Sequence, residues 1–217
     1  MKLSMVITAG GQSSRMGSRK DQLSFRGKCL LDLLIDRFKS ISSELIIVAN
    51  EPVVMFEPMI KVIEDVECFK GKGPLAGLYS GMTEAVNDYI GLIACDMPFA
   101  SAELVQFMAA KMEEEQLDAV VPSFQNRLHP LLAVYHRRIA EKIEQLLKED
   151  QRSIKALLAE IHYKKISPDE LPDSISREIA SILFNMNTPE DYHMAKMMMQ
   201  KKGDEHELCD HDGTNQH

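Results

Sequence analysis

Short apolar, β-branched runs alternate with longer amphipathic stretches as far as Val121, and this alternation constrains the fold more than any other feature. The runs predicted as strands are 3–8, 44–49, 60–63, 89–94 and 119–121, and the predicted helices are 29–40, 75–86 and 102–115. Repeated strand–helix units indicate a parallel sheet. The strands are almost continuously apolar, as in LIIVA and IGLIAC, which is typical of strands covered on both faces. The expected fold class is therefore α/β, a three-layer α/β/α sandwich with a mostly parallel sheet.

The pattern changes after Pro122. A hairpin-like piece at 131–135, helices at 137–148 and 153–160 and a strand at 163–166 indicate an appended α+β region. No linker divides the chain, so residues 1–202 are predicted to form a single domain. A last helix is predicted to begin at Thr188-Pro189, which supplies a capping hydroxyl and a proline at the first helical position. The acidic, aperiodic residues 203–217 are predicted to be a disordered tail.

Charge and hydropathy argue against several classes of partner. The chain has 33 acidic and 25 basic side chains, a formal net charge of −8, which disfavours whole-body attraction to nucleic acid or an anionic membrane. No apolar run approaches the roughly 20 residues of a membrane-spanning helix, and the N-terminal apolar stretch is too short for a secretion signal. We therefore expect a cytoplasmic protein with neither a nucleic-acid nor a membrane partner.

The cysteine and histidine residues give little support for a metal site. Cys29, Cys68, Cys95 and Cys209 form no C-x-x-C pair, and we interpret them as free thiols that are mostly buried. In the acidic tail, His206, Cys209 and His211 are compatible with metal binding. A solvated tail explains them equally well, because their spacing is not that of a closed zinc site.

A glycine-rich loop follows the first predicted strand and concentrates positive charge. Between Gln12 and Lys28 there are five basic residues and one acid, a local excess of four positive charges. The basic residues are Arg15, Arg19, Lys20, Arg26 and Lys28. Glycines let backbone N–H groups approach phosphate oxygens, so the loop predicts a triphosphate site in which Arg15, Arg19 and Lys20 neutralise the departing pyrophosphate. The spacing matches neither the Walker nor the dinucleotide motif, and a surface turn with solvated charges is the alternative.

Asp96 is a second candidate, because it directly follows the apolar strand 89–94 in the sequence ACDMPF. Ligands bind beyond the carboxyl ends of strands in α/β sheets. A single carboxylate there, supplemented by phosphates and water, suits Mg²⁺, so Asp96 is predicted to hold that ion. The alternative is that Asp96 caps the helix beginning near Ser101, although Ser101 itself offers a cap.

Three further segments are candidates for substrate contacts, and Glu64-Asp65 is predicted to lie at the same edge. In Gly73-Pro74-Leu75-Ala76-Gly77-Leu78-Tyr79-Ser80-Gly81 the small residues either admit a flat purine or allow tight helix–sheet packing. Glu64-Asp65 ends strand 60–63, and one of the two is a candidate acceptor for a base or ribose. His129 is interpreted as a substrate contact or part of a packed turn and not as a general base.

Five segments together resemble the motifs of the MobA family of molybdenum cofactor guanylyltransferases. They are AGGQSSRMG with Lys20, CDMPF, GPLAGLYSG, HPLLAVY and FNMNTPEDY. They occur in the family's order from Met5 to about Met199. The resemblance implies a Rossmann-like nucleotidyltransferase fold and Mg²⁺-dependent transfer of GMP from GTP to molybdenum-bearing molybdopterin, with release of pyrophosphate. It also implies recipient molybdoenzymes or other cofactor-biosynthesis proteins as partners.

The resemblance further assigns roles to residues. It implies GTP contacts for Thr8, Ala9, Gly10, Lys20, Asp65 and Asp96, a metal contact for Asp96, and pterin contacts for Asn185 and Asn187. Arg15, Lys20 and Asp96 form the expected catalytic set. Thr8 replaces the family's usual leucine. Arg19 replaces the aspartate that precedes the signature lysine in the family, so whatever role the family's aspartate has is in question for this chain. A cytidylyltransferase that uses CTP and a non-catalytic nucleotide-binding adaptor that delivers the cofactor are the alternatives.

Overall fold

The computed structural model describes residues 2–9, 24–25, 27–53 and 60–211. Within these residues, eight strands form one sheet in the order β10-β7-β9-β6-β1-β4-β5, with β8 paired to β7. Its strands are β1 (Leu3–Thr8), β4 (Glu44–Val48), β5 (Ile60–Ile63), β6 (Tyr89–Ala94), β7 (Ala119–Phe124), β8 (Arg127–Leu128), β9 (Leu132–His136) and β10 (Tyr163–Ile166). A separate short hairpin consists of β2 (Ser24–Phe25) and β3 (Lys28–Cys29).

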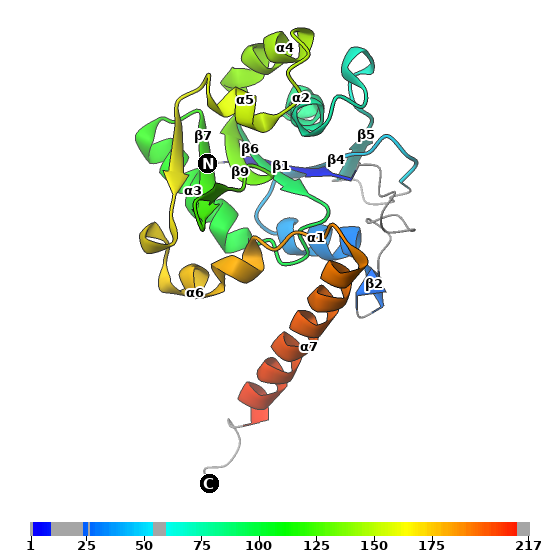
Figure 1. Cartoon of the computed structure of the whole chain (residues 1–217), viewed down its shortest axis with the longest axis vertical. Helices are drawn as coiled ribbons and strands as arrows, with labels where there is room; N and C mark the ends of the chain where they lie inside the picture. The colour runs from blue at the N-terminus through cyan, green and yellow to red at the C-terminus, as the bar shows by residue number, and fades with distance from the viewer. Residues whose placement is uncertain (1, 10–23, 26, 54–59, 212–217) are drawn as a thin grey trace.

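Helices cover both faces of the sheet (Figure 1). One layer contains α1 (Leu30–Phe38), α3 (Ala102–Glu115) and α6 (Asp173–Ile182), and the other contains α2 (Pro74–Glu84), α4 (Ala140–Lys148) and α5 (Ile154–Leu158). Each layer buries its own apolar cluster against the sheet. Successive residues of β1 show why the strands are apolar throughout, since Val6 packs under the α2 layer and Ile7 under the α1 layer. The predicted three-layer α/β/α sandwich is confirmed.

The sheet is mostly parallel around β1, which pairs in parallel with β4 and β6, while β4 pairs in parallel with β5. The region after Pro122 corrects the prediction of an appended α+β unit. Strand β9 inserts antiparallel between β6 and β7, and β10 adds to β7 in parallel. Strand β7 continues through Pro122, whereas the predicted strand ended at Val121. Pro122 is in register with Ile166 of the edge strand β10. Gln125 and Asn126, with φ of 49° and 60°, then reverse the chain into β8.

Helix α6 was not predicted, although its sequence carries a signal. Ile175, Ile179 and Ile182 are buried at helical spacing. The predicted bounds of β5, β6, β10 and α3 agree with the structure. No helix in the described part of the chain is long and apolar enough to cross a membrane.

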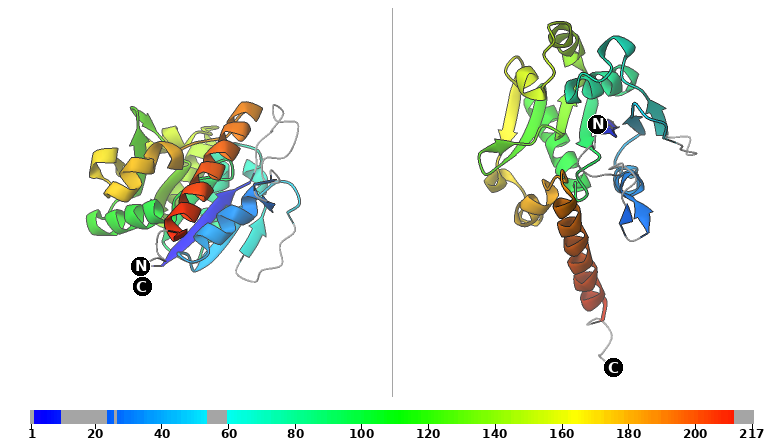
Figure 2. Two further views of the ribbon diagram at one scale, coloured as in Figure 1. Left: turned by 90° about the horizontal axis from the view of Figure 1, so that it is seen from below. Right: turned by 45° about the vertical axis from the view of Figure 1, so that its right-hand side comes forward.

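Helix α7 (Pro189–His211) extends away from the body of the protein (Figures 1 and 2). It begins as predicted, because Thr188 Oγ1 accepts a hydrogen bond from Asp191 N at 3.1 Å. The ring of Tyr192 meets Phe25 of the β2–β3 hairpin edge-on at 5.1 Å. The helix continues through 203–211, where a disordered tail was predicted, and the Met and Lys residues of 194–202 that precede this segment favour helix. Residues 212–217 lie outside the described chain, and a domain boundary at 202 stays a prediction.

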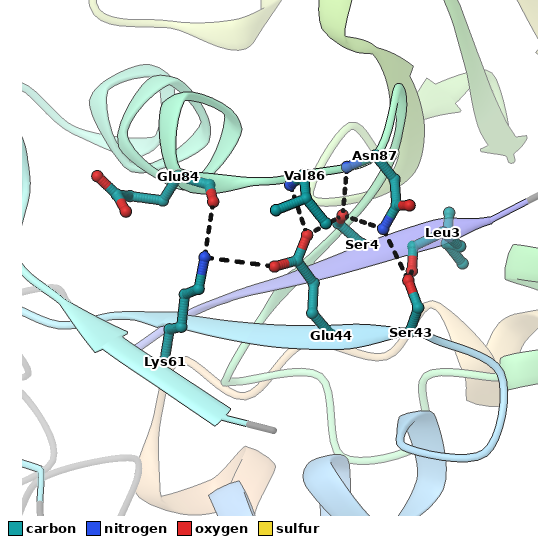
Figure 3. A network of polar contacts seen from close by, with 8 residues as sticks. All are labelled: Leu3, Ser4, Ser43, Glu44, Lys61, Glu84, Val86 and Asn87. Carbon is teal, nitrogen blue, oxygen red and sulfur yellow. Dashed lines mark hydrogen bonds and ion pairs between the residues drawn. The ribbon is translucent and has the colours of Figure 1, made fainter. Parts of the chain in front are cut away.

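A buried polar network joins the amino ends of β1 and β4 (Figure 3). Glu44, whose exposed fraction is 8%, accepts hydrogen bonds from the Ser4 hydroxyl and, at 2.7 Å, from Val86 N. Lys61 Nζ lies 3.5 Å from its other carboxylate oxygen. Asn87 Nδ2 donates to Ser4 Oγ at 2.9 Å. This network lies at the edge opposite the candidate site, and its contacts give it a structural role.

Candidate active site

Four neighbouring parallel strands place the candidate residues at one edge of the sheet. Thr8 of β1 is in register with Val48 of β4 and with Ala94 of β6, and Val48 is in register with Ile63 of β5. Polar residues follow two positions beyond this row, at Asn50, Asp65 and Asp96. Parallel strands all end at the same edge, so the register brings the carboxyl ends of these strands together.

Asp65 is part of a closed hydrogen-bonded unit. Its exposed fraction is 8%. Asp65 Oδ2 accepts hydrogen bonds from Asn50 Nδ2 at 2.7 Å and from Gly71 N at 3.2 Å, and Asp65 N donates to Asn50 Oδ1 at 3.1 Å. The unit ties the ends of β4 and β5 to the loop before α2. Sequence reasoning missed Asn50, although it follows an apolar strand just as Asp65 and Asp96 do.

Asp96 is partly buried, and its backbone connects two distant parts of the chain. Cys95 N donates to Thr8 O at 3.0 Å, and Met186 N donates to Asp96 O at 2.9 Å. The second bond brings the predicted pterin segment to the end of β6. The capping alternative for Asp96 is wrong, because Ser101 Oγ caps α3 by accepting from Leu104 N at 3.2 Å.

The two asparagines of the predicted pterin segment differ in their surroundings. Asn187 is exposed, and its N–H donates to Asp191 Oδ2 at 2.8 Å. Asn185 is partly buried, and within the described residues no hydrogen bond reaches its buried Oδ1 atom. A buried acceptor without a donor is costly, so Asn185 is the member of the pair better placed to gain a donor from water or a ligand.

Arg37 of α1 is a residue that sequence reasoning missed, and nothing in its amphipathic helix signals it. Its Nη1 atom donates to Pro98 O at 2.8 Å and to Ala100 O at 2.9 Å. Burial lowers the pKa of the guanidinium, which nevertheless stays charged at neutral pH because its ordinary pKa is so high. Arg37 therefore fastens the loop that carries Asp96.

The small residues of α2 provide close helix–sheet packing. A Cβ atom added to Gly81 would lie 2.4 Å from Val6 Cγ1, and one added to Gly77 would lie 2.9 Å from Thr8 Cγ2. Both strand residues belong to β1. The packing interpretation of this motif is therefore supported, since these positions admit no side chain without movement.

The turn that contains His129 lies at the same edge as Asp96. His129 N donates to Pro122 O at 2.9 Å, and Leu131 O accepts from Ala94 N, at the end of β6, at 3.0 Å. Burial, with a smaller effect of the positive charge on Arg127, lowers the pKa of His129 below its ordinary value of 6.5. The imidazole is therefore predominantly neutral at pH 7, and its position in a packed turn agrees with one of the two interpretations.

Several candidates fall on residues that the structure does not describe. Gly10, Arg15, Arg19 and Lys20 lie outside the described residues, so their positions near Asp96 stay predictions. Ala9, at the start of this segment, is described, and its N–H donates to Val48 O at 2.9 Å.

The described thiols and acids assemble no metal cluster. Across residues 2–9, 24–25, 27–53 and 60–211, no group of three or more His, Cys, Asp or Glu is arranged to hold an ion. Among the described cysteines, Cys29, Cys68 and Cys95 form no disulfide. Cys95 is buried as predicted, Cys29 is partly buried, and the prediction of burial is wrong for Cys68, which is exposed.

The strand order reverses beside β1, since β4 and β5 extend the sheet on one side and β6 follows on the other. Open α/β sheets bind ligands, nucleotides among them, in the crevice at such a reversal. The fold and the polar residues beyond the strand ends define an open α/β protein with a ligand site at this edge.

Comparison with known proteins identifies the family within this class. The family model of the MobA-like NTP transferase domain matches residues 5–166. A probable molybdenum cofactor guanylyltransferase of Bacillus cereus (strain AH820) is 33% identical over 204 residues, covering 93% of this chain and 99% of the relative. One from Natranaerobius thermophilus is 34% identical over 201 residues, covering 92% and 97%. The chain belongs to the MobA-like NTP transferase family and is a nucleotidyltransferase, as the sequence motifs predicted.

A solved structure shows the same fold. The molybdopterin-guanine dinucleotide biosynthesis protein A from Archaeoglobus fulgidus superposes with a TM-score of 0.77 at 22% identity, covering 91% of this chain and 99% of that one. The Rossmann-like nucleotidyltransferase fold is thereby confirmed.

Proposed function

We propose that this protein transfers GMP from GTP to the terminal phosphate of molybdenum-bearing molybdopterin and releases pyrophosphate. Membership of the MobA-like family and the names of the relatives support a nucleotidyl transfer role in molybdenum cofactor biosynthesis. The observation that carries the proposal is the hydrogen bond from Met186 N to Asp96 O. It joins the segment assigned to the pterin to the strand end assigned to the nucleotide, which supports a single site for both substrates.

The reaction makes modest demands on proton transfer. An ionised oxygen of the pterin phosphate attacks the α-phosphorus of GTP, the bond from that phosphorus to the oxygen bridging the β-phosphate breaks, and pyrophosphate leaves. A phosphate monoester is already ionised at neutral pH, so alignment and charge neutralisation matter most. We assign the neutralisation to Arg15 and Lys20. His129 is not needed as a base.

Asp96 fits a Mg²⁺ ion by the chemistry of its donor atoms. A carboxylate is a hard oxygen donor, and the described residues supply no larger ligand cluster. An ion held by Asp96 would take its other ligands from nucleotide phosphates and water, an arrangement that Mg²⁺ favours. When bound, Mg²⁺ supplies charge neutralisation at the triphosphate. We assign Asp65, positioned by Asn50, to hydrogen bonds with the base or ribose, and Thr8, Ala9 and Gly10 to contacts with GTP.

The test compares GTP with CTP, each with Mg²⁺ and molybdopterin, and follows both the dinucleotide product by HPLC and the release of pyrophosphate. We expect product with GTP. Asp96→Asn should lower the rate by two or more orders of magnitude, because a catalytic metal contributes several kcal/mol to the transition state. Asp173→Asn is the matched control, since that carboxylate is exposed on α6, and it should leave the rate unchanged.

Three results would contradict the proposal. A preference for CTP would indicate a cytidylyltransferase, nucleotide binding without turnover would indicate an adaptor, and full activity of Asp96→Asn would remove Asp96 from the mechanism. Recipient molybdoenzymes as partners and a cytoplasmic location stay predictions.

A further inference from the structure

We propose that Arg37 is a positioning residue that holds the loop 95–100 and thereby sets how the Asp96 carboxylate meets a nucleotide-bound metal ion. This inference rests on the proposed function, because it takes Asp96 as the metal ligand. Arg37 touches no substrate in this scheme and acts through the backbone of the loop.

The contacts of Arg37 are with the backbone only a few residues beyond Asp96. One nitrogen, Nη1, donates to both Pro98 O and Ala100 O, at 2.8 and 2.9 Å. The side chain is partly buried, and burial lowers the pKa of its guanidinium. A charged donor in a partly desolvated site binds carbonyl oxygens more strongly than a neutral one does. Two carbonyls on one cation fix the spacing of this part of the loop.

Two further backbone hydrogen bonds hold the other end of the loop. Cys95 N is bonded to Thr8 O, and Asp96 O accepts from Met186 N. These bonds fix the backbone up to Asp96 on its N-terminal side, and Arg37 fixes it on the C-terminal side. Hydrogen bonds from Met97 N to Ala94 O and from Ala100 N to Met97 O, each 3.2 Å, and the buried side chains of Met97 and Phe99 also hold the loop. Loss of the Arg37 bonds should therefore loosen the loop beside Asp96 without unfolding it.

Helix α1, which carries Arg37, follows the glycine-rich segment along the chain. Helix α1 begins at Leu30, directly after the β2–β3 hairpin, and the chain enters that hairpin from the glycine-rich segment. The helix that holds the Asp96 loop is therefore also the helix into which the predicted phosphate loop leads.

Two substitutions of Arg37 should weaken metal binding to different degrees. Arg37→Lys keeps a charge but presents it as a compact ammonium that lacks the planar fork of arginine. Arg37→Met keeps an unbranched chain and removes every donor. We expect an intermediate defect in the lysine variant and the full defect in the methionine variant.

The experiment measures metal binding directly in the full-length protein. Mn²⁺ is titrated in the presence of GTP and followed by electron paramagnetic resonance, and turnover is measured against Mg²⁺ concentration. Arg37→Met should raise the Mn²⁺ dissociation constant by about tenfold or more, in the range that loss of outer-sphere support costs metal sites. It should also raise the Mg²⁺ concentration for half-maximal turnover and lower kcat. The lysine variant should lie between.

Arg138→Met is the matched control. Arg138 also binds a backbone carbonyl, Gln116 O at 2.7 Å, together with Asp118 at 2.6 Å, but near the amino end of β6. Its loss should lower thermal stability without changing Mn²⁺ affinity. If Arg37→Met and Arg37→Lys bind Mn²⁺ with GTP as the wild type does, or if Arg138→Met weakens binding equally, the positioning role is refuted. A wild-type protein that binds Mn²⁺ and GTP but transfers no GMP refutes the proposed function alone.

Discussion

Replacing Gly81 by alanine should destabilise this protein, although alanine is the better helix former. The added Cβ would lie 2.4 Å from Val6 Cγ1, 2.6 Å from Val6 Cγ2 and 3.1 Å from Val6 Cβ. Since both γ-carbons are close, rotation of the valine side chain exchanges one overlap for another. Val6 is fully buried in β1, so relief requires α2 to move away from the sheet.

The expected magnitude is the difference of two effects. Forcing a methyl group into a packed core costs about 1–3 kcal/mol, and the upper part of this range applies because carbon atoms pack best at about 3.5–4.0 Å. Against this, alanine gains about 1 kcal/mol over glycine in a helix interior. The net loss should be about 1–2 kcal/mol. At about 2–4 °C per kcal/mol for a domain of this size, the melting temperature should fall by about 2–8 °C.

The assay is urea unfolding of Gly81→Ala, Val6→Ala and the double variant. Because Val6→Ala makes room for the new methyl group, the two changes should be coupled favourably by about 0.5–3 kcal/mol. Stability of Gly81→Ala equal to or above that of the wild type would refute the reasoning. Strict additivity in the cycle would show that the two residues do not oppose each other across the helix–sheet contact.

Two further predictions concern pH and the buried network. Burial, and to a smaller extent the charge of Arg127, keeps the pKa of His129 below 6.5 in the folded state. As pH falls, the unfolded chain therefore binds the proton before the folded chain does. The free energy of unfolding should consequently fall as pH drops through 6.5. In His129→Gln that fall should be smaller between about pH 7.5 and about pH 5.5 in urea titrations, and an unchanged fall would contradict the assignment. Glu44→Ala should cost about 2–4 kcal/mol in the same assay because the buried Ser4 hydroxyl and the partly buried Val86 N lose their acceptor. Lys61→Met should cost at most about 1 kcal/mol because Lys61 is largely solvated; equal losses would show that the ion pair and not the hydrogen bonds stabilises the network.

Much of the fold could be predicted because local patterns encode it. Strand 89–94 and helix 102–115 follow from hydrophobic period and end signals, which depend on neighbouring residues alone. The insertion of β9 between β6 and β7 could not be predicted in this way. Strand order depends on which buried surfaces match across the whole sheet. The continuation of β7 through Pro122 depends on pairing with β10, which is distant in the sequence.

The sequence by itself determined the α/β class, the family motifs and the places where strands run into Asp65 and Asp96, because these are properties of contiguous segments. Only the tertiary structure decided that Asn50 binds Asp65, that Arg37 holds the Asp96 loop and that Met186 bonds to Asp96 O. Those contacts join residues far apart in the chain, and they form only when the helix layers have packed on the sheet. The same packing decided the role of the α2 glycines, since the room for a side chain is set by the distance between two layers.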